Sequence, residues 1–246
     1  MVKNWFKKTP EHFRFTAKFP KVITHDKRLK NISKELEYFH KAILPLKDKT
    51  LALLVQMPPS LKISEGIENM RQHLVPQLDS SNFRYAVEVR DRSWFQDLAY
   101  NFFADNNICM VWSQLAELRT PPIATTDFLY IRFIGDRSIN ENDFGKIQKD
   151  RITEMKKWCS KLKRVIKEEE VGGGRQGRSK SISLAIVSAN NHYAGFGPET
   201  ANTFRKMIGL PEVKWGNKNK NEEKHKSHLI NDNKFSRQST ISDFIK

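Results

Sequence analysis

Six segments with the pattern of β-strands alternate with helical patterns along this chain, and this alternation restricts the fold more than any other feature. The expected strands cover residues 13–19, 51–57, 84–90, 108–113, 128–134 and 181–188, and the expected helices residues 29–44, 64–78, 94–105, 142–170 and 198–208. The strand at 51–57 is almost continuously apolar, as is typical when both faces are buried in a parallel sheet. Strands in alternation with helices indicate an α/β fold with a parallel sheet or barrel.

The segment at residues 84–94 indicates where chemistry would lie in such a fold. Its apolar residues alternate with others along the strand, which places Glu88 and Arg90 on the same strand face. A helical pattern begins at Trp94, so both charged residues lie at the carboxyl end of the strand, where α/β folds place their catalytic groups. The alternative is that Glu88 and Arg90 form an ion pair that only stabilises the structure, which is common for a Glu and an Arg taken alone.

Polar and charged residues also follow the other expected strands. The full set is Lys18, His25, Gln56, Glu88, Arg90, Ser113, Gln114, Arg132, Asp136, Arg137, Asn190, Asn191 and His192. Because the carboxyl ends of parallel strands meet at one rim, we expect these side chains to converge there. The general polarity of loops is enough to account for Lys18, Ser113 and Gln114. Arg132 lies inside an apolar strand, where an unpaired guanidinium is costly, so it requires Glu88 or an anionic ligand as its partner.

The chain of 246 residues is long enough for one large α/β domain, and its formal net charge is +15. A charge of this size suggests a polyanionic partner, such as nucleic acid or an anionic membrane surface. Residues 214–246 contain eight basic and four acidic residues, net +4, so +11 remains on residues 1–213. The basic character therefore belongs to the expected domain as well as to the tail.

The cysteines and the apolar runs bear on location. Cys109 and Cys159 are the two cysteines and form no Cys-x-x-Cys pair, which argues against a disulfide framework and a thiolate zinc site. The purest apolar run, residues 51–55, is too short to cross a bilayer, and no signal-peptide pattern opens the chain. We expect a soluble protein in the cytoplasm, associated with the nucleoid and not with a membrane.

From Lys214 the composition becomes polar, which predicts a disordered linker at residues 214–237. The following segment, 238–246, resembles the clamp-interacting peptide (PIP box) that tethers replication and repair proteins to the DNA sliding clamp. Gln238, Ile241 and Phe244 match that pattern, whereas Ile245 stands where a second aromatic residue is usual. The resemblance implies that Ile241 and Phe244 fill an apolar pocket of the sliding clamp (PCNA), which residues 238–245 would bind.

Motifs at residues 5–15, 20–25, 56–59, 87–94, 130–135 and 190–196 together resemble the family called domain of unknown function 72. The resemblance covers roughly residues 1–212 and implies a TIM-barrel-like fold with a polar pocket at the carboxyl ends of the strands. The matching pocket positions are His25, Gln56, Glu88, Arg90, Arg132 and Asn190. Family members begin with two further strands, which carry a Gly-x-Ser-Gly-Trp motif and a Glu-x-Asn motif that are absent here. We therefore expect six of eight barrel strands, completed by an upstream segment or by a separate chain.

The expected organisation is a TIM-barrel-like domain at residues 1–213 without its first two strands, a linker at 214–237 and a clamp-binding peptide at 238–246. The first hypothesis is a DNA repair or processing enzyme, of hydrolase or phosphodiesterase type, held at the clamp. Glu88 would be the general base or a metal ligand, His25 the general acid, and Arg90 and Arg132 would hold a phosphate. Further substrate contacts would come from Gln56, Asn190, Asn191 and Arg137.

Two other hypotheses stay open at this stage. The domain would act on or bind a small phosphorylated metabolite if the tail match is accidental and the positive charge serves solubility. It would be a non-catalytic adaptor if the barrel is incomplete. The sequence gives little support to a divalent metal cofactor, because the rim offers chiefly Glu88, His25, His192 and Asp136 as ligands.

Overall fold

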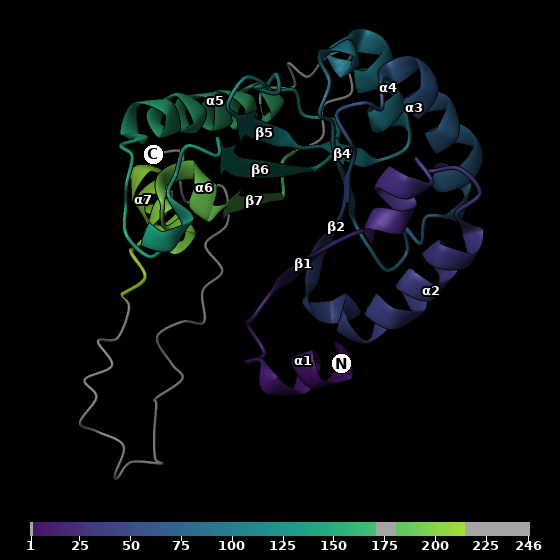
Figure 1. Ribbon diagram of the computed structural model, residues 1–246, viewed down its shortest axis with the longest axis horizontal. Coiled ribbons are helices and arrows are strands. Elements are labelled where there is room, and N and C mark those ends of the chain that lie inside the picture. The colour runs from purple at the N-terminus through teal and green to yellow at the C-terminus, as the bar shows by residue number, and fades with distance from the viewer. Residues whose placement is uncertain (1, 171–180, 215–246) are drawn as a thin grey trace.

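The computed structural model describes residues 2–170 and 181–214, which form a curved parallel sheet flanked by helices (Figure 1). One sheet has the order β1 (Phe15–Lys18), β2 (Thr50–Gln56), β3 (Tyr85–Glu88) and β4 (Ile108–Met110), and a second has the order β5 (Trp112–Leu115), β6 (Phe128–Gly135) and β7 (Leu184–Ala189). All strand pairs are parallel. Because Val111 alone separates β4 from β5, these two strands are the single strand expected at residues 108–113, and six strand positions result.

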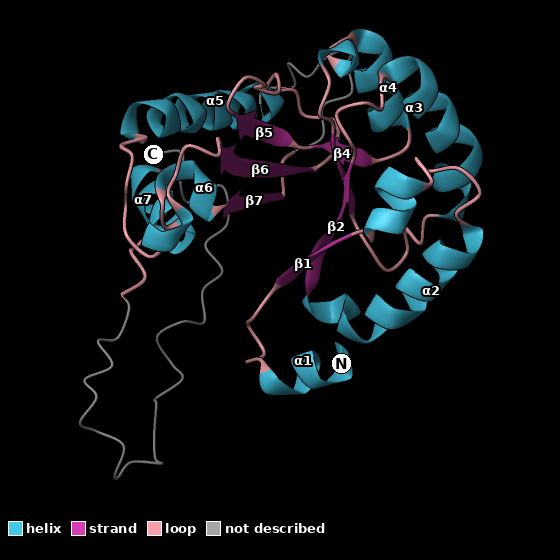
Figure 2. Cartoon of the chain, viewed as in Figure 1, coloured by secondary structure: helices cyan, strands magenta, loops and turns pink. Residues whose placement is uncertain are grey.

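Helices cover the outer side of this sheet in two groups (Figure 2). The first group contains α2 (Ser33–Ile43), α3 (Ile63–Asn69) and α4 (Asp97–Asp105), beside β1 to β4. The second contains α5 (Ile152–Glu170), α6 (Asn191–Ala194) and α7 (Gly197–Met207), beside β5 to β7. A further helix, α1 (Val2–Lys8), packs beside the helical turn Leu44–Lys49 that precedes β2. The α/β, TIM-barrel-like fold expected from the sequence is thus confirmed.

Alternate residues of each strand face opposite sides of the sheet, as their period of two predicts. Leu53 and Val55 of β2 pack against the helices, whereas Ala52 and Leu54 belong to a separate cluster on the concave side. That inner cluster consists of Ala52, Leu54, Ala86, Cys109, Val111, Phe128, Tyr130 and Ile186. The hydroxyl of Tyr130 on β6 donates to Thr16 Oγ1 on β1 at 3.1 Å, so the sheet curls until its two halves touch across the interior.

Three helices begin later than the sequence pattern predicts. The helix expected at 29–44 is α2, which begins at Ser33. The expected helix at 142–170 begins only at Ile152, after a turn in which the Asp150 carboxylate accepts the backbone N–H of Ile152 at 2.8 Å. The expected helix at 94–105 begins at Asp97. Trp94 instead ends a short 3-10 turn, where its fully buried indole donates to the Leu61 carbonyl at 2.9 Å.

Two smaller findings concern the expected loop near residue 24 and the membrane question. The segment predicted as a polar loop after Pro20 forms a π-helical turn, Val22–Asp26. Among the described helices, none combines the length and the apolar character that a bilayer crossing requires.

Candidate functional site

A completely buried carboxylate, that of Glu88, lies between two guanidinium groups at the carboxyl end of β3. Arg90 Nε donates to Glu88 Oε1 at 2.5 Å, and Arg90 Nη2 contacts the same oxygen. Arg132 Nη1 donates to the other oxygen, Oε2. The side chains of Arg90 and Arg132 are 15% and 20% exposed, against 0% for Glu88. These charge-assisted bonds offset the cost of burying the carboxylate, and the three groups, the Glu88 cluster, keep a net charge of +1.

Strand register brings these distant residues together. Glu88 pairs in register with Gln56 of β2, and Arg132 of β6 lies between Ser113 of β5 and Ser188 of β7. Because side chains alternate, Arg132 follows Tyr130 on the concave face, and Glu88 follows Ala86 there. The prediction that Glu88 is the partner of Arg132 is therefore confirmed.

A cavity of about 630 Å³, the mouth cavity, opens at the same end of the strands. Its walls are Arg90, Leu115, Ala116, Glu117, Leu118, Ile134, Gly135, Asp136, Arg137, Glu141, Asn190 and His192. The structure thus brings Arg90, Arg137 and Asn190 to one cavity, and Arg132 is joined to it through Glu88. The predicted convergence on one rim holds for these residues.

His25 belongs to the turn before α2 and is not one of the residues that line the mouth cavity. Its Nδ1 lies 2.7 Å from the Thr24 hydroxyl. Partial burial lowers the pKa of His25, and the charges of Lys18, Lys21 and, to a smaller extent, Arg90 lower it further. The imidazole is therefore neutral at neutral pH, a state suited to accepting a proton and less suited to the general-acid role expected from the sequence.

The two asparagines after β7 have local structural partners. Asn190 Oδ1 accepts the backbone N–H of His192 at 3.1 Å and caps α6. Asn191 Oδ1 accepts the N–H of Gly197, the first residue of α7, at 2.8 Å. Asn190 still lines the mouth cavity, whereas Asn191 does not. Gln56 lies beside Glu88 in the sheet but likewise outside the cavity wall.

Three further polar residues, Ser113, Gln114 and His192, have defined contacts in the structure. The buried Ser113 hydroxyl lies 3.0 Å from Thr120 Oγ1, and Gln114 Oε1 accepts the Trp158 indole N–H. Both residues are buried within β5 and serve the fold there, so the general polarity of loops is not the reason for their presence. His192 lines the mouth cavity with its Nε2 3.3 Å from Glu141 Oε1. Its Nδ1 is buried without a hydrogen-bond partner among the described residues. The Asn-Asn-His run after β7 was the sequence signal for it.

Asp136 is an ion-pair residue of the rim. Its pKa is lowered, first by the Ser138 hydroxyl, then by the Ser138 backbone N–H and by Arg151, which lies 3.1 Å away. Within the described ranges, no three His, Cys, Asp or Glu side chains are grouped as a metal site would require.

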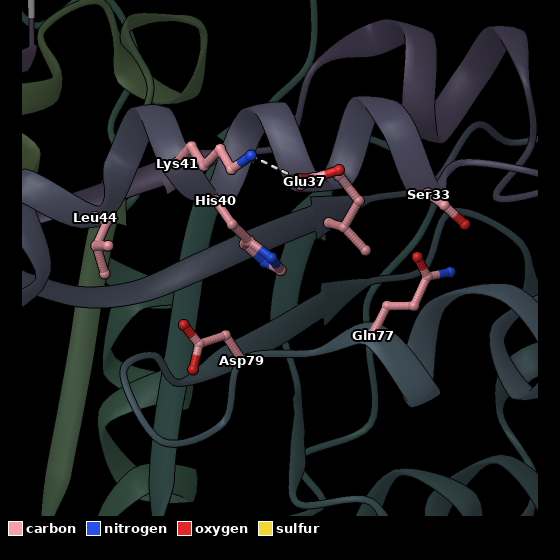
Figure 3. Close-up of a pocket in the computed structure, with 8 residues that line it drawn as sticks. Ser33, Glu37, His40, Lys41, Leu44, Gln77 and Asp79 are labelled. Carbon is pink, nitrogen blue, oxygen red and sulfur yellow. Dashed lines mark hydrogen bonds and ion pairs between the residues drawn. The ribbon is translucent and has the colours of Figure 1, made fainter.

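A second cavity of about 320 Å³, the α2 cavity, lies beside α2 on the outer side of the sheet (Figure 3). Its walls are Ser33, Leu36, Glu37, His40, Lys41, Leu44, Gln77 and Asp79. His40 Nε2 lies 2.9 Å from the Tyr85 hydroxyl, which also accepts the Asp79 backbone N–H at 2.9 Å. None of the residues predicted for the site lines this cavity, and Gln238, Ile241 and Phe244 of the predicted clamp peptide lie outside the described residues.

Residues 1–226 match the family model described as Protein of unknown function DUF72. A solved DUF72 family protein from Thermotoga maritima is 25% identical, with a TM-score of 0.63 over 83% of this chain and 77% of that chain. A DUF72 family protein from Enterococcus faecalis is 20% identical, with a TM-score of 0.62 over 85% of this chain and 84% of that chain. No curated protein matches.

Proposed function

This chain belongs to the DUF72 family, and we propose that it is a nucleic-acid-processing enzyme that binds a phosphate group at the Glu88 cluster. The observation that carries the proposal is the buried Glu88 carboxylate held between Arg90 and Arg132 beside a cavity of about 630 Å³. Glu88 accepts from two nitrogens of Arg90 and one of Arg132. Each guanidinium has five N–H donors, so donors remain on both planar groups for the oxygens of a phosphate.

The roles follow from these contacts. Both oxygens of Glu88 already accept hydrogen bonds, so Glu88 orients the two arginines, in place of the general-base or metal-ligand role first assigned to it. Arg90 and Arg132, with the exposed Arg137 at the cavity wall, stabilise negative charge on the phosphate. Asn190 contacts the substrate from the wall of the cavity, whereas His25, which does not line the cavity, has no direct contact with the substrate in this proposal. The reaction class that suits these groups is hydrolysis of a phosphodiester.

Phosphate binding is tested by isothermal titration of inorganic phosphate into the wild type, Arg132→Gln and Arg137→Gln. We expect Arg132→Gln to weaken binding by tenfold or more, about the free energy of one charged hydrogen bond. Arg137→Gln keeps the Glu88 cluster intact and is expected to weaken binding about fivefold. Arg71→Gln, an exposed arginine on the outer side, is the matched control. Equal affinity in all four proteins would refute the proposed site.

Tethering to the DNA sliding clamp is a second part of the proposal. Its support is the match of Gln238, Ile241 and Phe244 to the clamp peptide, after a polar segment in a basic chain. Ile241→Ala with Phe244→Ala should abolish clamp capture in a pull-down and leave the folded domain unchanged. Ser239→Ala, between the anchor positions, is the control and should bind like the wild type. Retained capture by the double variant would remove the clamp from the proposal.

Completion of the sheet is a third part. In the described residues, β1 and β7 each hydrogen-bond to a single neighbouring strand, and open sheet edges invite pairing. Further strands, from an upstream segment or from a separate chain, would cover these edges. An in-frame Gly-x-Ser-Gly-Trp segment in the genomic sequence ahead of Met1 would identify the first source.

The second candidate is an enzyme or binder of a small phosphorylated metabolite. The volume of the mouth cavity favours it, because ligand pockets are typically about 300–1,000 Å³. A mononucleotide and an oligonucleotide distinguish the two candidates. Equal affinity for both favours the metabolite, and tighter, salt-dependent binding of the oligonucleotide favours nucleic acid.

A further inference from the structure

The loop after β5 connects the mouth cavity to the surface of α5. Leu115 to Leu118 form part of the cavity wall. The chain then turns back, with the Leu115 N–H donating to the Leu118 carbonyl at 2.9 Å, and Arg119 forms an antiparallel bridge with Gln114. One side of this short loop therefore faces the cavity while Arg119 lies beside the end of β5.

A chain of contacts joins Arg119 to α5. The Gln114 side chain accepts the indole N–H of Trp158 at 2.5 Å, and the ammonium of Lys161 lies 4.7 Å from the centre of the Trp158 ring. The pKa of Lys161 is lowered, first by partial burial and then by the charges of Arg119, Arg164 and Lys157. Among the described residues, the charges that lower the pKa of Lys161 are all positive, so like charges are gathered here.

The exposed surface of α5 continues this positive region. Lys157, Lys161 and Arg164 have helical spacing of four and three residues, which places them on one face. Residues 152–167 contain six basic residues and one carboxylate, Glu154, and the last three residues of α5, 168–170, are glutamates. Concentrated charge of one sign destabilises a fold through self-repulsion, which a polyanionic partner relieves.

Arg92 adds a positive charge beside the loop that lies between the mouth cavity and the surface of α5. It follows β3 directly after the Glu88 cluster, and its Nη2 donates to the Glu117 carbonyl at 3.1 Å. Positive groups therefore run from Arg90 in the cavity over the loop, where Glu117 is the one carboxylate, to α5. We call Arg92, Arg119, Lys157, Lys161 and Arg164 the basic track.

We infer that the basic track binds the phosphate backbone of a polynucleotide strand, one phosphate of which occupies the mouth cavity. The inference rests on the proposed function and names its substrate class, a polymer with phosphates at regular intervals. A free metabolite would occupy the cavity alone and would leave the basic track without a role. Arginine and lysine side chains spread along a surface are the usual means of binding a nucleic-acid backbone without reading its sequence.

The test compares Lys157→Gln/Lys161→Gln with Lys7→Gln/Lys8→Gln. Both variants remove two positive charges, and the second pair lies on α1, well apart from α5 (Figure 1). Fluorescence anisotropy measures binding of a labelled single-stranded DNA, and isothermal titration measures binding of thymidine monophosphate. For the α5 variant we expect the slope of log affinity against log salt to fall by about 1.4, and DNA affinity to fall about tenfold. Thymidine monophosphate binding should not change, since the cavity is intact.

The outcomes separate the inference from the proposed function. Equal DNA affinity in the α5 and α1 variants overturns the basic track, even if thymidine monophosphate binds the cavity. Loss confined to the α5 variant supports the basic track, and a failure of thymidine monophosphate to bind would then refute the phosphate site alone. Vesicles containing phosphatidylserine are the third probe. Binding of vesicles without binding of DNA would overturn the polynucleotide in favour of a membrane surface.

Discussion

The two ends of β3 carry buried polar clusters of opposite character. At its first residue, the Tyr85 hydroxyl contacts His40 and the Asp79 backbone N–H, and neutral groups satisfy one another there. His40 and Asp79 line the α2 cavity (Figure 3). At its last residue, Glu88 points inward to two arginines, and positive charge remains in excess. A balanced neutral network needs no ligand, whereas paired arginines with remaining donors beside a cavity are suited to an anion. This difference is our reason for proposing the phosphate site at the carboxyl end of the strand.

The largest effect is expected from Glu88→Gln. The substitution removes the negative charge between Arg90 and Arg132 and leaves two mostly buried guanidinium groups facing each other. Breaking a buried ion pair from one side costs about 3–5 kcal/mol, and the partial exposure of the arginines favours the lower end. Urea unfolding measures the change. A loss no greater than that of Tyr85→Phe would contradict the difference between the two clusters.

A smaller loss of stability is expected from Tyr85→Phe. The variant removes the hydroxyl that joins His40 to the Asp79 backbone, and such a change costs about 1–2 kcal/mol. Phosphate affinity should equal that of the wild type, because the hydroxyl lies outside the mouth cavity. Weaker phosphate binding in calorimetry would show that the two ends of β3 are coupled, and would contradict the claim that only the Glu88 end binds phosphate.

Arg137→Gln should change binding without changing stability. Arg137 is exposed at the wall of the mouth cavity and has no ion-pair partner among those described. We expect about fivefold weaker phosphate binding, near 1 kcal/mol, and the same urea midpoint as the wild type. Lys41→Gln beside the α2 cavity is the matched control and should leave phosphate affinity unchanged.

The smallest expected effect is a pH dependence from His40. Burial lowers the pKa of His40 in the folded protein, so the unfolded chain binds more protons between that lowered value and the ordinary 6.5. Stability should therefore be full above pH 6.5 and fall as the pH drops through this window. His40→Gln should flatten this part of the stability curve measured by thermal melts. An unchanged curve would show that the pKa of His40 is the same in the folded and the unfolded protein.

The sequence predicted the parts of the site that depend on local pattern. Alternation along β3 placed Glu88 and Arg90 on one face, and the charge of Arg132 in an apolar strand required a buried partner. These inferences succeed because strand geometry is periodic and an unpaired buried charge is costly.

The remaining parts depend on tertiary contacts. The loop at 115–120 turns back because Arg119 bridges to Gln114, and its approach to α5 depends on the bond between Gln114 and Trp158. Residues forty-four positions apart carry no local signal of that contact. The start of α5 could have been predicted from the sequence, because Asp150 is a residue type that often accepts a backbone N–H where a helix begins.

The central claim, that the Glu88 cluster binds a phosphate group, is tested most directly by crystallography with tungstate, a heavy-atom analogue of phosphate. We expect an anomalous peak in the mouth cavity within hydrogen-bond distance of Arg90 and Arg132, displaced by added phosphate. Tungstate bound elsewhere on the basic surface, with the mouth cavity empty, would contradict it.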